Sequence, residues 1–381
     1  MKTNWQTKKL GEICDVLDSQ RKPVTRRDRI SGEYPYYGAT GIQDYVNNYI
    51  FDEKLILIGE DGAKWGAGEN TAFVAEGKYW VNNHAHVIRP HRDQALDNWI
   101  VYFLNVNDLS KHITGLTVQK LNQAKLRDIE LPLPPLVEQK RIVKKLDEIF
   151  EKVAQAKENA EKNLQNSKDL FDSYLAGVLQ TVRIKSGDKK LGDACESVEY
   201  GTSAKSKKTG KVAVLRMGNI QNGRIDWSSL VYTDDKDEIK KYLLKNNDVL
   251  FNRTNSPELV GKTAIYKGEM PAIFAGYLIR IHRKEKVLDA DYLNYFLNSD
   301  LAKEQGKKVV ISSVNQANIN GQKLKDYLIP LPSLADQKAI VKKLDALSVE
   351  TKKLEKIYEQ KLVDLEELKK SVLKKAFAGE L

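Results

Sequence analysis

Two stretches of the chain carry a narrow stripe of apolar residues, with charged residues filling most of the other positions. Within residues 142–178 the apolar and small residues recur at alternating steps of three and four, and the same spacing recurs within residues 340–372. This spacing is typical of coiled coils. Both stretches are poor in Pro and Gly, so the pattern predicts two long helices of about 45 residues, or roughly 65 Å at 1.5 Å per residue.

A helix of this length needs a partner, because one compact domain cannot cover its whole apolar stripe. The chain supplies a second helix of matching length and pattern, and we expect the two to pair antiparallel. The residues expected to hold the helices together or to bind partner proteins are Leu136, Gln139, Ile142, Leu146 and Ile149 in the first helix, and Leu334, Gln337, Ile340, Leu344 and Leu347 in the second.

Both helical stretches open with nearly the same sequence. "LPLPPLVEQKRIVKKLD" (Leu131–Asp147) and "IPLPSLADQKAIVKKLD" (Ile329–Asp345) share twelve of seventeen residues at a constant offset of 198. A second pair of phrases, "KKLGEIC" (Lys8–Cys14) and "KKLGDAC" (Lys189–Cys195), precedes them. The chain is therefore expected to hold a pseudo-twofold internal repeat, with Cys14 and Cys195 as matching buried residues rather than a disulfide.

The remaining sequence predicts two mixed α/β domains. In each block, strand-like apolar runs precede a helical pattern; the strands are expected at residues 54–59 and 84–90 with a helix at 96–105, and at 212–220, 247–253 and 277–283 with a helix at 288–300. We therefore divide the chain into a first domain (1–130), a first long helix (131–180), a second domain (181–328) and a second long helix (329–381), with a linker near residues 184–190.

The net charge of +10 is concentrated in one block. Residues 181–328 carry 26 basic and 18 acidic side chains, whereas residues 1–130 carry 17 of each. Such an excess favours a polyanionic partner, although scattered lysines on a soluble protein would give the same total. No apolar run is long enough for a membrane span or a signal peptide, so we expect a cytoplasmic protein with no membrane contact.

Motifs for catalysis are missing or incomplete. A DNA amino-methyltransferase needs an Asn/Asp-Pro-Pro-aromatic motif, and the chain has no Asn-Pro or Asp-Pro pair. A phosphate-binding loop has the motif G-x-x-x-x-G-K-[ST]. The segment "SPELVGKT" (Ser256–Thr263) has the final Gly-Lys-Thr, but Ser256 stands where the first Gly is required. His84 and His86 would share a face of a strand as a metal-ligand pair, but no third ligand is arranged near them, so we expect no metal.

Two variable blocks that each lead into a "PLPxLxxQKxIVKKLD" helix resemble the specificity subunit of a type I restriction–modification system. The resemblance covers the whole chain and includes "SVLKKAFAGEL" (Ser371–Leu381), which is similar to that family's last helix. Ser333 in place of the second Pro and Asp336 in place of the usual Glu are modest departures.

The resemblance implies a non-catalytic DNA-binding protein. It implies two α/β target-recognition domains joined by two long antiparallel coiled-coil helices, each domain reading one half of a bipartite double-stranded DNA target. The helices would set the length of the spacer, the DNA between the two half-sites whose bases are not recognised. They would also dock two adenine-methyltransferase subunits, and a restriction and motor subunit would complete the enzyme. S-adenosylmethionine is expected in the methyltransferase subunits, with no cofactor bound by this chain.

Candidate DNA contacts are basic and amide side chains on Gly-bracketed loops. Arg and Lys neutralise phosphates, whereas Arg, Asn and Gln pair with base edges. A run with five basic residues in eleven, Ser19–Arg29, stands out in the first block. The full set is Arg21, Lys22, Arg26, Arg27, Tyr37, Thr40, Lys64, Asn82, Asn83 and His84 in the first block, and Lys205, Lys207, Lys208, Arg216, Asn219, Arg253, Thr254, Asn255, Ser256 and Lys262 in the second.

Three other functions compete with this interpretation. The chain would be a standalone enzyme acting on nucleic acid if it turned substrate over by itself, which the missing motifs argue against. It would be a coiled-coil scaffold without a DNA role if it had no salt-dependent DNA affinity. It could also serve as the recognition subunit of a different restriction or modification system.

Overall fold

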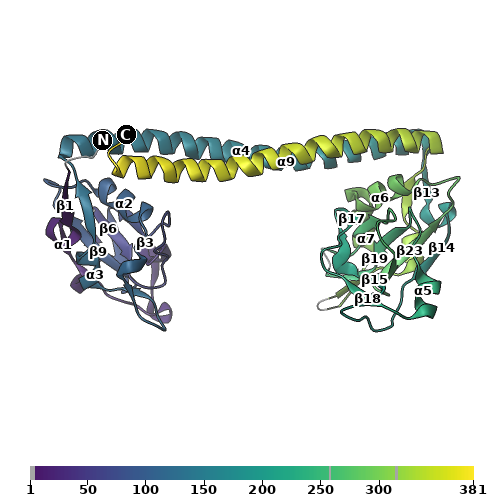
Figure 1. Ribbon diagram of the computed structural model, residues 1–381, viewed down its shortest axis with the longest axis horizontal. Coiled ribbons are helices and arrows are strands. Elements are labelled where there is room, and N and C mark those ends of the chain that lie inside the picture. Colours follow the sequence, from purple (N-terminus) through teal and green to yellow (C-terminus); the bar gives the residue numbers. More distant parts are fainter. Residues whose placement is uncertain (1–4, 257–258, 314–315) are drawn as a thin grey trace. The chain divides into compact units, whose positions relative to one another are not determined.

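The structure is a computed structural model that describes residues 5–256, 259–313 and 316–381 (Figure 1). It contains two compact units: unit 1 comprises Met1–Glu161 and Glu359–Leu381, and unit 2 comprises Lys162–Tyr358. The long helices α4 (Leu136–Ser186) and α9 (Leu334–Phe377) therefore each contribute one part to each unit. The expected fold class, two mixed α/β domains with two long helices, is confirmed.

Unit 1 is built on the central strand β6, which is buried on both faces. Ile56 and Ile58 pack toward Trp99 of α2, while Leu55 and Leu57 pack toward a second sheet that contains Tyr79. The two sheets have the orders β2-β9-β6-β7 and β4-β3-β8-β5. The elements are β1 (Gln6–Lys9), α1 (Leu10–Ile13), β2 (Cys14–Val16), β3 (Ser31–Gly38), β4 (Gly41–Val46), β5 (Phe51–Asp52), β6 (Leu55–Gly59), β7 (Ala72–Ala75), β8 (Lys78–Val81), β9 (Ala85–Pro90), α2 (Asp97–Val106), β10 (Ile113–Thr114), β11 (Lys120–Leu121), α3 (Gln123–Arg127) and β12 (Glu130–Leu133).

Unit 2 repeats this plan around the central strand β19. Val249 and Phe251 pack toward α6, and Leu250 packs into a second cluster on the opposite face. Its main sheet has the order β14-β23-β19-β21-β17-β16, with smaller sheets β18-β15-β22 and β20-β25-β24. The elements are β13 (Asp188–Lys190), β14 (Cys195–Tyr200), β15 (Val212–Leu215), β16 (Ile220–Gln221), β17 (Gly223–Ile225), β18 (Val231–Thr233), α5 (Lys236–Tyr242), β19 (Val249–Asn252), β20 (Thr254–Asn255), β21 (Thr263–Ile265), β22 (Ala272–Phe274), β23 (Leu278–Arg283), α6 (Ala290–Asn298), α7 (Asp300–Val309), β24 (Ile311–Ser313), β25 (Gln316–Asn318), α8 (Gly321–Lys325) and β26 (Leu328–Pro330).

Equivalent strand pairs close the two units. In unit 1, β1 pairs antiparallel with β12, and Lys9 forms an ion pair with Asp128 at 2.9 Å. In unit 2, β13 pairs antiparallel with β26, and Lys190 forms an ion pair with Asp326, also at 2.9 Å. The predicted linker at residues 184–190 is wrong, because α4 continues to Ser186 and residues 188–190 form β13.

The repeated cysteines lie where the sequence predicted them. Cys14 begins β2 and Cys195 begins β14, and both are buried free thiols. Burial raises the pKa of the Cys195 thiol to about 12, and burial also raises the pKa of Cys14. Neither residue is set up as a reactive nucleophile.

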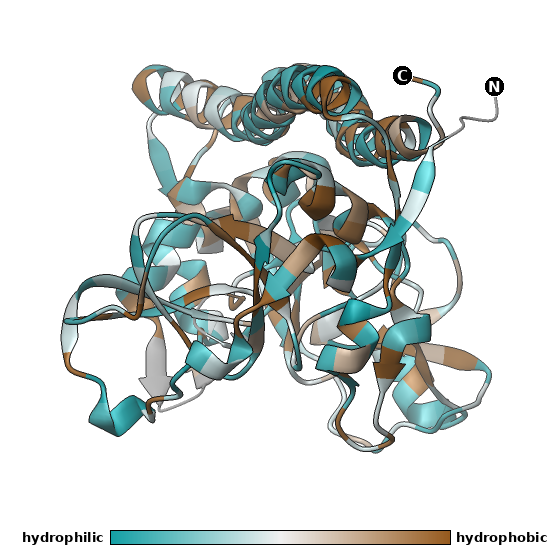
Figure 2. Ribbon diagram, turned by 90° about the vertical axis from the view of Figure 1, so that its left-hand side faces the viewer, coloured by the Kyte–Doolittle hydropathy of each residue, from teal (hydrophilic) through white to brown (hydrophobic). Residues whose placement is uncertain are grey.

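The long helices run antiparallel within unit 1. The Arg141 guanidinium donates to the Leu381 carbonyl oxygen at 2.5 Å, and Lys157 forms an ion pair with Glu366 at 2.8 Å. Residue numbers thus rise along α4 as they fall along α9. Hydrophilic residues colour much of both helices, with hydrophobic ones interspersed (Figure 2).

The first turns of each helix pack on their own unit as well as on the partner helix. Ile142 and Leu146 are fully buried in one cluster with Trp99 and with Leu373 of α9, and Leu344 is buried with α6 residues of unit 2. Leu136, Ile149, Leu334, Ile340 and Leu347 are half-buried. The predicted stripe therefore serves two interfaces rather than a helix pair alone.

Candidate nucleic-acid interface

Four segments of unit 1 meet at one edge of the β2-β9-β6-β7 sheet. The Leu17 N–H bonds the Val87 carbonyl, the Glu60 N–H bonds the His84 carbonyl at 2.9 Å, and the Leu121 N–H bonds the Glu60 carbonyl at 2.8 Å. These bonds bring together the segment after β2, the loop after β6, the turn before β9 and strand β11. Three of the four segments carry side chains that the sequence predicted to contact DNA.

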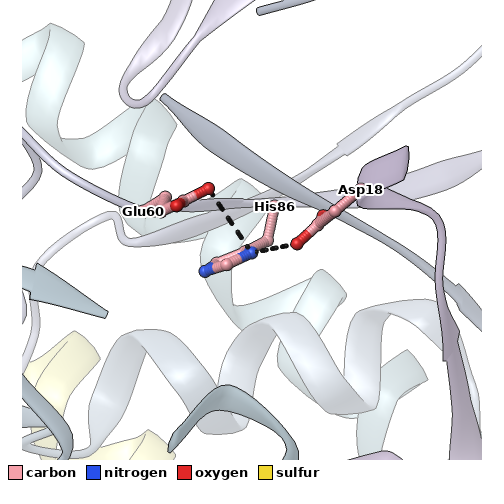
Figure 3. Close-up of side chains that lie close together, drawn as sticks. All are labelled: Asp18, Glu60 and His86. Atoms are coloured by element: carbon pink, nitrogen blue, oxygen red, sulfur yellow. Dashed lines mark hydrogen bonds and ion pairs between the residues drawn. The ribbon is translucent and has the colours of Figure 1, made fainter. Parts of the chain in front are cut away.

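A charge cluster, buried except for one lysine, lies beneath these loops. We call Asp18, Arg21, Glu60, His86 and Lys120 the Glu60 cluster; three of its members are shown in Figure 3. Glu60 accepts from Arg21 at 2.5 Å and from Lys120 at 2.6 Å, and Arg21 also lies 3.5 Å from Asp18. Asp18 lies 2.6 Å from the Nδ1 atom of His86, whose side chain is 1% exposed. The cluster therefore ties all four segments to one another.

The Glu60 cluster is an ion-pair network rather than a metal site. Ligand atoms of Asp18, Glu60 and His86 lie within 4.8 Å of one another, a spacing that could hold an ion. However, the Nε2 atom of His86 contacts the Leu121 carbonyl oxygen at 2.6 Å, and Arg21 and Lys120 already neutralise Glu60. A metal would need a bare ring nitrogen and free carboxylate oxygens.

The electrostatics of Asp18 follow from this packing. Burial opposes ionisation of the carboxyl, but the hydrogen bond and charge of His86, the Val87 N–H and Arg21 outweigh it and lower the pKa of Asp18. Asp18 therefore stays charged under ordinary conditions. The predicted sharing of a strand face by His84 and His86 is wrong, because His84 lies in the turn before β9 and contacts Asp61 at 2.5 Å.

Most of the predicted DNA contacts of unit 1 are exposed. Tyr36 anchors the segment that carries several of them by accepting from the Val24 N–H at 3.0 Å, and Trp80 donates to the Lys22 carbonyl at 2.6 Å. Tyr36 and Trp80 are paired neighbours on β3 and β8, and together they hold the loop against this sheet. The exposed residues are Lys22, Arg26, Arg27, Thr40, Lys64, Asn83 and His84.

Three predicted contacts of unit 1 have internal partners instead. The Arg21 side chain is only 13% exposed within the Glu60 cluster. Asn82 is buried, donates to the Gln43 side chain at 3.1 Å and accepts from the His84 N–H at 2.8 Å. Tyr37 is half-buried against Phe73 and Tyr79. These residues shape the loops, and the exposed ones are the better candidates for contact.

In unit 2 the segment after β19 gathers four predicted residues. Arg253 is half-buried, donates to the Gly276 carbonyl at 3.2 Å and lies over the Tyr200 ring at 4.9 Å. Thr254 is buried in β20 and accepts from the Asn318 side chain, while Asn255 accepts from the Ser256 N–H. Pro257 and Glu258, which follow in the same predicted loop, lie outside the described residues.

The other predicted residues of unit 2 lie in three places. Lys205, Lys207 and Lys208 are exposed, and Lys207 lies 3.5 Å from Asp234. Arg216 is exposed beside Asn219, which is buried and organises its turn by accepting from the Arg216 N–H and donating to two carbonyls. Lys262 is half-buried and donates to the Gln221 side chain at 3.3 Å.

The matching glutamines of the long helices are internal anchors. Gln139 is fully buried, accepts from the Leu96 N–H at 2.9 Å and donates to the Gln94 and Pro134 carbonyls at 2.8 Å. Gln337 makes the equivalent set with the Asp289 N–H and the Val287 and Pro332 carbonyls. Both side chains are therefore used inside their own units, which corrects the expectation that they face the other helix or a partner.

Several residues that build the site were not predicted from sequence. Asp18, Glu60 and Lys120 belong to the Glu60 cluster, but their positions along the chain give no signal that they meet. Tyr102 and Tyr295 each donate to an aspartate of the adjoining long helix, Asp147 and Asp345 respectively. The repeat places both aspartates at matching positions, and this signal could have identified the pair.

Comparisons with known proteins agree with the repeat. The family described as "Type I restriction modification DNA specificity domain" matches residues 2–165 and 185–363. A putative type I restriction enzyme specificity subunit of Haemophilus influenzae is 26% identical, covering 89% of this chain and 86% of its own length. The EcoKI specificity subunit of Escherichia coli K12 is 27% identical, covering 87% of this chain and 75% of its own length.

Solved structures share the fold. A chain from work on complex assembly and conformational transition of the type I R-M system aligns with a TM-score of 0.75 at 18% identity, covering 99% of this chain and 98% of that chain. The HsdS subunit from Thermoanaerobacter tengcongensis aligns with a TM-score of 0.60 at 17% identity, covering 100% of this chain and 98% of that one. None of the helices in the described part of the chain is long and apolar enough to cross a membrane.

Proposed function

The chain belongs to the family of type I restriction–modification DNA specificity domains, and we propose from this premise that it selects a bipartite DNA sequence for adenine methylation. Its role is recognition rather than catalysis. Unit 1 would read one half of the target and unit 2 the other half. The proposed recognition domains are residues 1–130 and 181–328.

The observation that carries this proposal is the repetition of one scaffold with different loops. Anchors recur at matching positions, as in the buried Gln139 and Gln337 or in the exposed Lys9–Asp128 and Lys190–Asp326 ion pairs. The loops differ: the exposed Lys64 follows the central strand β6 in unit 1, whereas the half-buried Arg253 follows the central strand β19 in unit 2. A repeated scaffold with different polar loops suits the reading of two different base sequences.

The long helices are the proposed docking surface for two methyltransferase subunits. Residues 131–180 and 329–381 carry the repeated sequence, so they would present like surfaces to two copies of one partner. S-adenosylmethionine would bind in those partner subunits, and a restriction and motor subunit would join the same assembly. The scaffold function without a DNA role is disfavoured by the exposed basic loops of both units.

The test is a map of methylated adenines in cells with and without this gene. We expect a split sequence motif, two short specific halves around an unread spacer, to be methylated only when the gene is present. A methylation pattern that does not change when the gene is deleted would reject the proposal. A continuous rather than split motif would point to a recognition subunit of a different modification system.

A further inference from the structure

A short hairpin in unit 1 presents two apolar side chains to solvent. Strands β10 and β11 pair antiparallel through Ile113 with Leu121 and Thr114 with Lys120, so residues 115–119 form the tip. Leu116 is 107% exposed and Val118 is 66% exposed. Side chains this exposed contribute little apolar burial to the fold, so both are available for contact with a partner.

The backbone of the tip is tightly turned. Gly115 has φ +96°, and a Cβ added there would lie 2.1 Å from the Val118 carbonyl oxygen. At the base, the Thr114 hydroxyl donates to the Lys120 carbonyl at 3.2 Å and accepts from the Asn122 side chain at 3.3 Å. The hairpin is thus a defined structure that holds Leu116 and Val118 outward.

The base of the hairpin is fastened to the Glu60 cluster. Lys120 forms an ion pair with Glu60 at 2.6 Å, and the Leu121 carbonyl oxygen lies 2.6 Å from His86. Asp61 and Lys120 also form an antiparallel bridge. The Glu60 cluster, which holds the predicted DNA-contacting loops, therefore also holds the hairpin beside them.

Several lysines lie near the hairpin, and most of the carboxylates near it are paired. Gly115 and Gln119 line a shallow polar hollow together with Lys64. Lys111 and Lys125 lie near His112, as do Asp128, which is paired with Lys9, and Glu130. Burial and the two lysines outweigh the two carboxylates and lower the pKa of that imidazole. The nearby carboxylates Glu60 and Asp61 are already paired, with Arg21 and Lys120 and with His84 respectively. A polyanion is the partner that this arrangement of charge complements.

We propose that the hairpin is an apolar wedge, in which Leu116 and Val118 pack against bases of the first half-site while Lys64 and Lys111 contact the flanking phosphates. This inference rests on the proposed function and adds a recognition element to it. Proteins that deform DNA insert Leu, Phe or similar side chains between base steps, and the cost of unstacking depends on the step. The wedge would thus add selectivity for an easily unstacked step without reading a base edge.

Duplex DNA fits the tip better than a protein partner does. Two apolar side chains on a narrow tip surrounded by lysines offer far less than the roughly 800 Å² per partner of a standard protein interface. A protein surface would also have to match several cations around so small an apolar contact.

The test uses the full chain in complex with its co-expressed methyltransferase subunit. The probe is a duplex with the split target found by methylation mapping, carrying 2-aminopurine at successive positions of the first half-site. We expect wild-type binding to raise 2-aminopurine fluorescence at one step in addition to the adenine to be methylated, which methyltransferases turn out of the base stack. Leu116→Ser should abolish that rise and weaken binding roughly tenfold, whereas Leu116→Met should retain both and Thr117→Ala, on the same tip, should behave as wild type.

Each outcome decides a different point. Normal affinity and an unchanged fluorescence rise for Leu116→Ser would overturn the wedge while leaving the proposed function standing. Normal DNA affinity with loss of the methyltransferase subunit would also overturn it, because the tip would then contact protein. A wild-type complex that binds no split target would reject the proposed function and the wedge together. Since Leu116 is fully exposed, an unchanged unfolding temperature is expected for every variant.

Discussion

At the scale of single residues, neighbouring charges in this chain have different roles. Arg21 and Arg29 point to carboxylates, Glu60 and Asp44, whereas Arg26 and Arg27 are exposed. The sequence predicted phosphate contact for Arg21 from the density of basic residues around it. Glu60, its partner, lies 39 positions away, and charge density alone gives no signal of such a pair. We therefore expect phosphate contact from the exposed members of the run.

The Glu60 cluster should make unit 1 sensitive to acid through Asp18. Its pKa is lowered in the folded state, so its contribution to stability is complete above the unfolded pKa of about 3.9 and is lost as pH falls through that value toward the lower folded pKa. Asp18→Asn should lower the unfolding temperature at neutral pH and flatten its decline below about pH 4. Thermal unfolding followed by circular dichroism from neutral to acid pH measures both effects.

The matched control is Asp93→Asn, at an exposed carboxylate of the same unit. This variant should keep the wild-type unfolding temperature at neutral pH and the wild-type decline in acid. An Asp18→Asn chain whose unfolding temperature falls as steeply in acid as that of the wild type would show that Asp18 is not stabilised by the cluster.

At the scale of elements, regular patterns were predictable and short ones were not. Apolar residues spaced alternately three and four positions apart identified both long helices, and apolar runs identified β6, β9, β19 and β23. The hairpin of β10 and β11 has only two residues per strand, too few for an alternation to be recognised. The burial of Ile142 and Leu146 against Trp99 was also missed, because a stripe on a helix does not say which partner covers each turn.

Gln139 should contribute to stability although most residues of its helix are exposed or half-buried. Gln139→Met would leave the Leu96 N–H and the Gln94 and Pro134 carbonyls without their partner, at a cost of about 2–4 kcal/mol in the free energy of unfolding. Lys140→Met, at the exposed neighbour, should change it by less than about 0.5 kcal/mol. Urea unfolding followed by tryptophan fluorescence measures this, because Trp5, Trp65, Trp80 and Trp99 all lie in unit 1.

The repeat supplies a second copy of the same experiment. Gln337→Met should destabilise unit 2 in the same way, with Trp227 as the reporter. Equal unfolding free energies for Gln139→Met and Lys140→Met would contradict the assignment of these glutamines as anchors.

At the scale of the whole molecule, the chain combines one scaffold used twice with two sets of loops. The repeated sequence revealed the scaffold and, through its resemblance, the family. The functional residues of the loops are much harder to predict from sequence alone. Asn and Gly are typical of turns, and the sequence does not show whether they shape a loop or contact a ligand. Asn82 and Asn219 illustrate this, since both are buried and accept a hydrogen bond from a backbone N–H of their own turn.

The central claim is that each unit reads its own half-site, and a cycle of protein and DNA changes tests it most directly. Binding of the full chain with its methyltransferase subunit is measured on the intact target and on duplexes with either half scrambled. Arg253→Ala should weaken binding roughly tenfold while the second half is intact and cause no further loss once that half is scrambled. Asn83→Ala, at an exposed amide of unit 1, should show the same dependence on the first half. Equal losses on both scrambled duplexes, or no loss on the intact target, would contradict the account.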